Sequence, residues 1–168
     1  MKKQGFTLIE LMVVIVIMGI LAAVAVPKLF GMIAKSKASE VGPAAGTYVK
    51  LQQAYFSESG KAGGWQLIGY LAPNSGTTTN FTYGRGSIET AASATLSTTA
   101  TTGWQAANNQ NLNDCAAVSG ATANGDITGA HWTVTLAAAD GAQDITFAAS
   151  AGDAGCVALT PTFDKIGK

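Results

Sequence analysis

The chain has 168 residues, of which 48% are hydrophobic and 12% are charged, and its formal net charge at pH 7 is zero. This length suits one ordinary domain, so separate catalytic and regulatory domains are not expected. The balanced charge, together with the lack of a basic stripe with interleaved aromatic residues, argues against a protein that binds nucleic acid. The apolar residues are concentrated in residues 1–30, which indicates a chain with two unlike parts.

The N-terminal segment combines a short basic leader with a long apolar run. Residues 1–5 read MKKQG, and residues 6–26 are interrupted only by Thr7, Glu10 and small residues. As a helix, this run would span about 31 Å, which is close to the thickness of the hydrocarbon core of a bilayer. The basic leader is expected to stay in the cytoplasm, so the residues after Lys28 are expected on the other side of the membrane.

Glu10 is anomalous within this run, because a carboxylate in a segment built for lipid is energetically costly. One explanation is that Glu10 lies at the headgroup interface near the start of the helix. Water and the helix dipole would make a negative charge tolerable there. This explanation applies to a single subunit in the membrane and gives the carboxylate no further role.

The stretch GFTLIELMVVIVIMGILAAVAVP resembles the class III signal and membrane segment of type IV prepilins. The resemblance rests on a basic leader that ends in Gly5, on Phe6 as the new N-terminus, and on Glu10 at the fifth mature position. It implies that a prepilin peptidase cuts between Gly5 and Phe6 and then methylates the Phe6 amine. It also implies that an assembly platform and its ATPase polymerise the subunits.

The resemblance gives roles to further residues of the apolar run. Cleavage would create an ammonium group at Phe6, and pairing with Glu10 of an adjacent subunit would neutralise both charges in the apolar core of a filament. The pair would therefore set the register of assembly. Gly19 and Pro27 weaken the helix, because Pro27 cannot supply a backbone hydrogen bond. We expect helical order to be lost near Pro27 only in the polymer.

The fold class expected is α+β, the pilin fold, in which one long helix packs on a small antiparallel sheet. The expected segments are a leader at 1–5, a membrane and assembly helix at 6–27, an amphipathic continuation of the helix at 28–57, and a globular β-rich part with a C-terminal disulfide loop at 58–168. In the continuation, apolar residues recur at three- and four-residue spacing. Gly42 and Pro43 predict a bend or a one-turn break within it.

Strand signals are clearest near the C-terminus. Apolar and polar residues alternate in 131–137 and again in 145–149, with a turn expected at Asp140 and Gly141. A shorter strand is expected around residues 80–83. Residues 87–103 form a polar, low-complexity stretch that is expected to be exposed. The three tryptophans are expected to belong to the core.

Cys115 and Cys156 lie far apart and lack the close pairing that zinc and redox sites use. Because the chain begins with a segment that resembles an export signal, a disulfide between them is favoured over two free thiols. Such a bond would restrict the unfolded chain by roughly 4 kcal/mol. The bond is expected to pin the C-terminal strand region. His131 has no second ligand or base nearby in the sequence and is expected to be structural.

No nucleophile elbow and no phosphate-binding loop occurs in the sequence, so we predict a protein that is not an enzyme and has no cofactor or metal site. The resemblance implies a structural subunit of a type IV pilus that serves motility, adhesion or DNA uptake. It would be held in the inner membrane as a precursor and then join an extracellular filament. Its partners would be further copies of itself, the prepilin peptidase, the assembly platform and its ATPase, and no specific nucleic acid.

Two alternatives remain open at this point. The nearer one is the major pseudopilin of a type II secretion system, which shares the same N-terminal signal. The more remote one is a membrane-anchored enzyme or binding domain, whose activity would survive deletion of the apolar segment.

Overall fold

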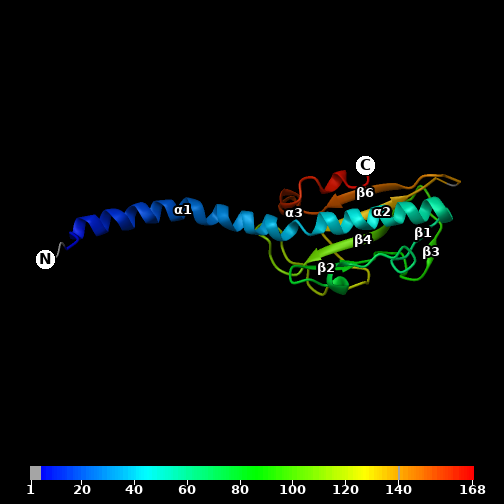
Figure 1. Cartoon of the computed structure of the whole chain (residues 1–168), viewed down its shortest axis with the longest axis horizontal. Coiled ribbons are helices and arrows are strands. Elements are labelled where there is room, and N and C mark those ends of the chain that lie inside the picture. Colours follow the sequence, from blue (N-terminus) through cyan, green and yellow to red (C-terminus); the bar gives the residue numbers. More distant parts are fainter. Residues whose placement is uncertain (1–4, 140) are drawn as a thin grey trace. The chain divides into compact units, whose positions relative to one another are not determined.

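The computed structural model describes residues 5–139 and 141–168. The chain divides into two compact units, an N-terminal one that extends to Ile33 and a C-terminal one from Ala34 to Lys168, which we call the head. Figure 1 shows the helices and strands of both units with their labels.

The N-terminal unit consists of the larger part of helix α1 (Leu8–Ala38). The helix continues through Pro27, and its side chains from Leu8 to Phe30 are exposed on every side of the unit. An exposed helix that is apolar all round suits a membrane or the core of a larger assembly. Helical residues Leu8–Ser59 form the one stretch in the described part of the chain that is long and apolar enough to cross a bilayer.

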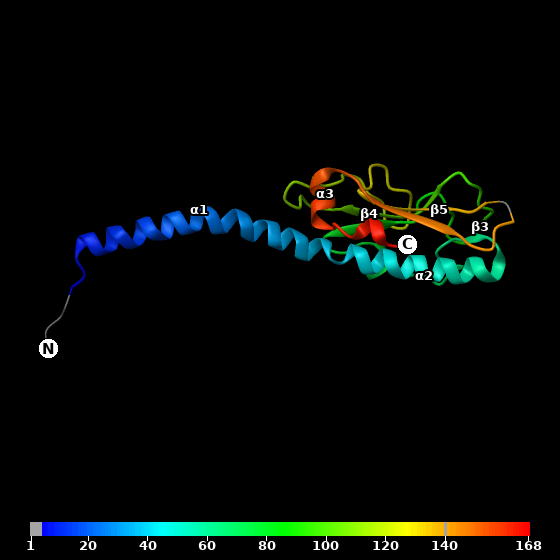
Figure 2. The ribbon, with the colours of Figure 1, turned by 90° about the horizontal axis from the view of Figure 1, so that it is seen from above.

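The head combines helix α2 with two antiparallel sheets, which confirms the predicted α+β fold class. In Figures 1 and 2, α2 runs beside the strands of the larger sheet, whose order is β2-β4-β5-β6. The elements are α2 (Val41–Ser59), β1 (Ala62–Gly63), the 3-10 helix η1 (Pro73–Gly76), β2 (Phe81–Gly84), β3 (Ser93–Ala94), β4 (Thr101–Asn108), β5 (Trp132–Ala137), β6 (Thr146–Ala151), α3 (Ala154–Leu159) and the 3-10 helix η2 (Phe163–Lys165).

Helix α2 packs on the sheet through the face that its apolar spacing predicts. Val41, Ala45 and Tyr48 are fully buried, whereas Leu51 and Tyr55 farther along the same face are half-buried. Burial of this stripe supplies the hydrophobic contribution that holds the helix on the sheet.

The break in the long helix does not fall at Gly42 and Pro43, as the sequence suggested. It falls at Ser39 and Glu40, just before α2 begins. Pro43 therefore lies in the first turn of α2, where backbone N–H groups have no intrahelical partner and a proline removes no hydrogen bond.

Strands β5 and β6 form the predicted hairpin. In β5, buried and half-buried residues alternate, and Val134 and Leu136 pair with Ala149 and Phe147 of β6. Gly141 has a φ of 71°, which fits the predicted turn, whereas Asp140 lies outside the described residues. The predicted strand around residues 80–83 is also present as β2.

Most of residues 87–103 are exposed, as predicted, but the prediction was wrong at two apolar residues and at the C-terminal end of the stretch. Ile88 and Leu96 are buried, and Thr101 already begins β4, a central strand that pairs with both β2 and β5. From Gly103 onward, successive residues of β4 are buried on both faces. The strand therefore lacks the alternation that identifies a half-buried strand in a sequence.

The tryptophans agree with the prediction, whereas the C-terminal cysteine lies in an element that was not predicted. The three tryptophans, Trp65, Trp104 and Trp132, lie in the core as predicted. Cys156, however, lies in α3 and not in a strand. This helix has only six residues, which is too short for a helical period to stand out in the sequence.

Two buried glutamine side chains fasten surface segments to the core. The amide of Gln52, in the orientation that satisfies both of its groups, donates to the Gly63 carbonyl at 3.0 Å and accepts from the Gly63 N–H at 3.1 Å. The amide of Gln105 does the same with Ile127, at 3.1 Å and 2.8 Å. Each amide thus pairs with main-chain groups as a neighbouring strand would.

Candidate functional site

The first candidate site lies where α1 begins. The Thr7 backbone N–H and hydroxyl both donate to Oε2 of Glu10, at 2.8 Å and 2.6 Å. This is a capping box, in which a residue before the first helical turn and an acidic residue three positions later satisfy free backbone donors. Sequence reasoning missed this role, although the Thr-x-x-Glu spacing is its usual signal.

The capping contacts leave the charge of Glu10 without a cation. Among the described residues Glu10 forms no salt bridge, and Phe6 beside it is 84% exposed. Within the described residues, the carboxylate is thus hydrogen-bonded but not neutralised.

Gly5 and Gly19 have no packing role within their own unit. A Cβ atom added to either glycine would meet no atom within 4 Å. Pro27 lies inside α1 without ending it. Packing among the described residues therefore does not require glycine at either position.

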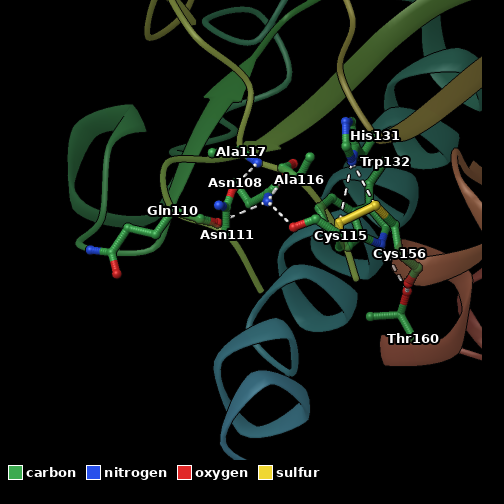
Figure 3. Close-up of a disulfide and its surroundings, with 10 residues drawn as sticks. All are labelled: Asn108, Gln110, Asn111, Cys115, Ala116, Ala117, His131, Trp132, Cys156 and Thr160. Atoms are coloured by element: carbon green, nitrogen blue, oxygen red, sulfur yellow. Dashed lines mark hydrogen bonds between the residues drawn. A yellow bond between two sulfur atoms is a disulfide. The ribbon is translucent and has the colours of Figure 1, made fainter. Parts of the chain in front are cut away.

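The second candidate site surrounds the disulfide between Cys115 and Cys156, which the structure contains as predicted. Figure 3 shows His131 directly beside the two sulfur atoms. Its Nδ1 lies 2.6 Å from Sγ of Cys156 and 3.3 Å from Sγ of Cys115. The three residues are 16 and 25 positions apart along the chain, so no local spacing could have brought them together in the sequence analysis.

A third polar cluster lies at the junction of α1 and α2. The hydroxyl groups of Tyr83 and Thr78 both donate to Oε1 of Glu40, at 2.8 Å and 2.6 Å. Burial, followed by the hydrogen bond to Glu40, raises the pKa of Tyr83 far above its usual value, so the phenol stays protonated and keeps donating. This cluster fastens the end of the long helix to β2 and has no group suited to catalysis.

Comparison with known proteins gives the first of these sites a context. Residues 1–26 match the prokaryotic N-terminal methylation motif. The chain is also 46% identical over 57 residues to the type IV major pilin protein PilA of Myxococcus xanthus (strain DK1622). It is 56% identical over 39 residues to the type IV major fimbrial protein FimA of Dichelobacter nodosus. In its N-terminal segment, the chain is similar to type IV pilins.

The similarity to other pilins is confined to part of each chain. The match to PilA covers 34% of this chain and 26% of PilA, and the match to FimA covers 23% and 25%. The fimbrial protein EcpC of Eikenella corrodens is 47% identical over 58 residues, which are 34% of this chain and 38% of EcpC. The chain therefore spans well under two thirds of the length of these relatives. No solved structure matches it.

The pilins that the chain resembles are structural subunits and not enzymes, in agreement with the predicted class of protein. The apolar helix, the methylation motif and the disulfide of this chain are all features predicted from its sequence.

Proposed function

We propose that this chain is the precursor of a type IV pilus subunit that polymerises through its N-terminal helix into an extracellular filament. The observation that carries the proposal is the surface of α1 from Leu11 to Val26, which is apolar on every side and exposed within its unit. In water such a surface is unfavourable, whereas a bilayer and then the core of a filament would each cover it.

Glu10 is the residue that distinguishes assembly from simple anchoring. Removal of residues 1–5 creates an ammonium group at Phe6, and the Glu10 carboxylate of an adjacent subunit would pair with it. Because an unpaired charge in an apolar core is costly, only subunits in the correct register neutralise both groups. The lack of any requirement for glycine at Gly5 and Gly19 within the single chain agrees with roles in cleavage and in contact between helices.

The other steps belong to the same proposal, and the methylation motif supports the processing step. A prepilin peptidase cuts between Gly5 and Phe6 and methylates the new amine, while residues 6–27 hold the precursor in the inner membrane. The assembly platform and its ATPase then extract the subunit into the filament. In that polymer the helix loses order near Pro27, and residues 28–57 pack on the globular part at 58–168. The filament serves motility, adhesion or DNA uptake.

The proposal is tested by measuring the yield of surface filaments from cells that express the wild type, Glu10→Ala, Glu10→Gln or Thr7→Val. Mass spectrometry of the wild-type subunit is expected to find N-methyl-Phe6 as its first residue. Both Glu10 variants are expected to be cleaved and held in the membrane but to lose most of the filament yield, because the ammonium stays unpaired. Glu10→Gln is the sharper variant, since its amide oxygen still accepts from Thr7.

Thr7→Val is the matched control. It removes the capping hydroxyl and leaves the charge of Glu10 intact, so its filament yield is expected to stay near that of the wild type. Normal yields from both Glu10 variants would refute the register role of the carboxylate. An intact Met1 in assembled filaments would refute the type IV assignment as a whole.

A further inference from the structure

Three atoms that commonly bind soft metal ions converge beside the disulfide. Sγ of Cys115, Sγ of Cys156 and a ring nitrogen of His131 all lie within 4.8 Å of one another. Figure 3 shows that they come from three segments, namely the loop after β4, the residue before β5, and α3. Cys115 and Cys156 are buried, whereas His131 is half-buried and leaves the cluster open to solvent on one side.

The backbone around this cluster is held in place by hydrogen bonds that do not involve the disulfide. Leu112 and Cys115 exchange two backbone hydrogen bonds, at 2.9 Å and 3.1 Å, and the buried Asn108 amide donates to the Cys115 carbonyl. The N–H of Gly152 donates to the carbonyl of His131. These contacts would keep the segments in place after the sulfur–sulfur bond opens.

The close approach of α3 to the cysteine loop is also built into the backbone. A Cβ atom at Gly155 would collide with the carbonyl group of Asp114, so a glycine beside Cys156 allows the two segments to meet. Both sulfur atoms are therefore brought to the same place by main-chain packing as well as by their own bond.

We propose that the dithiol form of the head, before Cys115 and Cys156 are oxidised, binds a zinc ion through these two sulfurs and Nδ1 of His131. Two thiolates and one imidazole form a soft ligand set that suits tetrahedral zinc, with water in the fourth position. Binding releases the two thiol protons and needs no oxidant or reductant. The disulfide ties up both sulfurs, so metal binding and oxidation exclude each other.

This inference differs from the simpler view that His131 only packs against a finished disulfide. A packing role requires no metal affinity in the reduced chain. A ligand role makes the imidazole as important for binding as either sulfur, and it makes bound zinc slow the oxidation of the thiols, because only free thiolates attack an oxidant.

The test uses the full-length chain in detergent micelles, reduced with a phosphine and titrated with cobalt(II) and then zinc(II). Reduced wild type is expected to show thiolate-to-cobalt charge-transfer absorption and the visible bands of tetrahedral cobalt, both removed by zinc. His131→Gln is expected to weaken zinc binding by at least about tenfold, as loss of a ligand should exceed loss of a supporting contact. Cys156→Ser is expected to abolish the charge-transfer band.

Two controls separate binding from folding. Asp114→Asn changes the carboxylate next to Cys115 and is expected to leave zinc affinity unchanged. Tryptophan fluorescence, which arises only in the head, reports whether the reduced chain stays folded. Equal zinc affinity of wild type and His131→Gln would overturn the proposal. So would a reduced head that unfolds and is not refolded by zinc, or oxidation by a disulfide reagent that zinc does not slow in the wild type.

Discussion

At the scale of single residues, Gly103 in β4 has no room for a side chain. A Cβ atom there would collide with the hydroxyl of Tyr48 and lie 2.7 Å from Cδ1 of Leu136. The register of β4 against β5 also shifts between Thr102 and Trp104, and the Gly103 carbonyl accepts a hydrogen bond from the Trp65 indole at 3.1 Å. The bulge and the missing side chain at Gly103 thus allow Tyr48 of α2 to pack closely against the sheet.

We predict that Gly103→Ala destabilises the head by about 1–3 kcal/mol, because the core must move to accept the methyl group. Gly46→Ala is the matched control, since Gly46 lies inside α2 and a Cβ there would meet no atom within 4 Å. That change is expected to stabilise by about 0.5–1 kcal/mol through helix propensity. Denaturant unfolding of the full chain in micelles, followed by tryptophan fluorescence, measures both values.

The methyl group of Gly103→Ala would collide with the hydroxyl of Tyr48, and this contact allows a second test. Tyr48→Phe removes the hydroxyl that the new methyl group would meet. The double variant with Gly103→Ala is therefore expected to recover part of the lost stability, giving a favourable interaction energy in a double-mutant cycle. Strictly additive effects would show that the collision is relieved elsewhere in the core.

At the scale of elements, Glu40 joins the end of the long helix to β2. Its Oε1 is the shared acceptor for the hydroxyls of Tyr83 and Thr78. We predict that Glu40→Ala costs about 1–3 kcal/mol of head stability, because the Tyr83 residue is fully buried and its hydroxyl loses its acceptor. Glu40→Gln keeps an oxygen at that place and is expected to cost less, since a neutral acceptor forms weaker hydrogen bonds.

Glu58→Ala supplies the comparison for Glu40. Glu58 is exposed on α2 and forms no salt bridge among the described residues. Its replacement is expected to change the free energy of unfolding by no more than about 0.5 kcal/mol. Equal losses for Glu40→Ala and Glu58→Ala, read from the same denaturant curves, would mean that the junction is held by apolar packing alone.

The elements also show which parts of the fold a sequence reveals. The hairpin of β5 and β6 was predictable because one of its faces is more buried than the other. Apolar and polar residues therefore alternate along each strand, and this alternation is visible in the sequence. Strand β4 was not predictable, because residues on both of its faces are buried and its sequence shows no alternation of apolar and polar residues. Its content of Thr, Gly and Ala also resembles that of a loop. The stripe on α2 was predictable, whereas the position of its break was not.

The candidate sites also differ in how far the sequence reveals them. Glu10 was conspicuous in the sequence because it is a charge within an apolar run, and its contact with Thr7 is local. The environment of His131 could not be predicted, because the cluster depends on three segments that only the folded head brings together. Local chemistry can be read from spacing, but chemistry assembled by topology cannot.

At the scale of the whole head, buried tyrosines set a limit on alkaline stability. Burial raises the pKa of Tyr70 to about 12 from an ordinary value of 10.0, and it raises the pKa of Tyr48 and Tyr83 as well. A phenol with a raised pKa in the folded state contributes stability that is fully present below about pH 10. That contribution is lost as the pH rises through the folded-state pKa, because the unfolded chain ionises first.

We therefore predict that the head is insensitive to mildly alkaline solution and loses stability steeply between about pH 10 and pH 12. Tyr70 alone accounts for about 3 kcal/mol of that loss. Urea unfolding at a series of pH values gives the slope, and Tyr70→Phe is expected to reduce the slope even if it lowers the starting stability. A slope unchanged by Tyr70→Phe would contradict the assignment.

The pairing of Gln52 with Gly63 and of Gln105 with Ile127 has a consequence for how this protein can evolve. Each glutamine recognises a main-chain N–H and a carbonyl, which every residue except proline offers, so the hydrogen bonds themselves do not depend on the side chains of the attached segments. Position 63 still requires glycine, because a Cβ atom there would lie 2.7 Å from Cγ2 of Ile68. The surface of the head can therefore drift in sequence while its anchors stay constant. Related proteins with different surface residues are therefore expected to keep both glutamines. These contacts would hold the backbone of the head in the same arrangement in each of them.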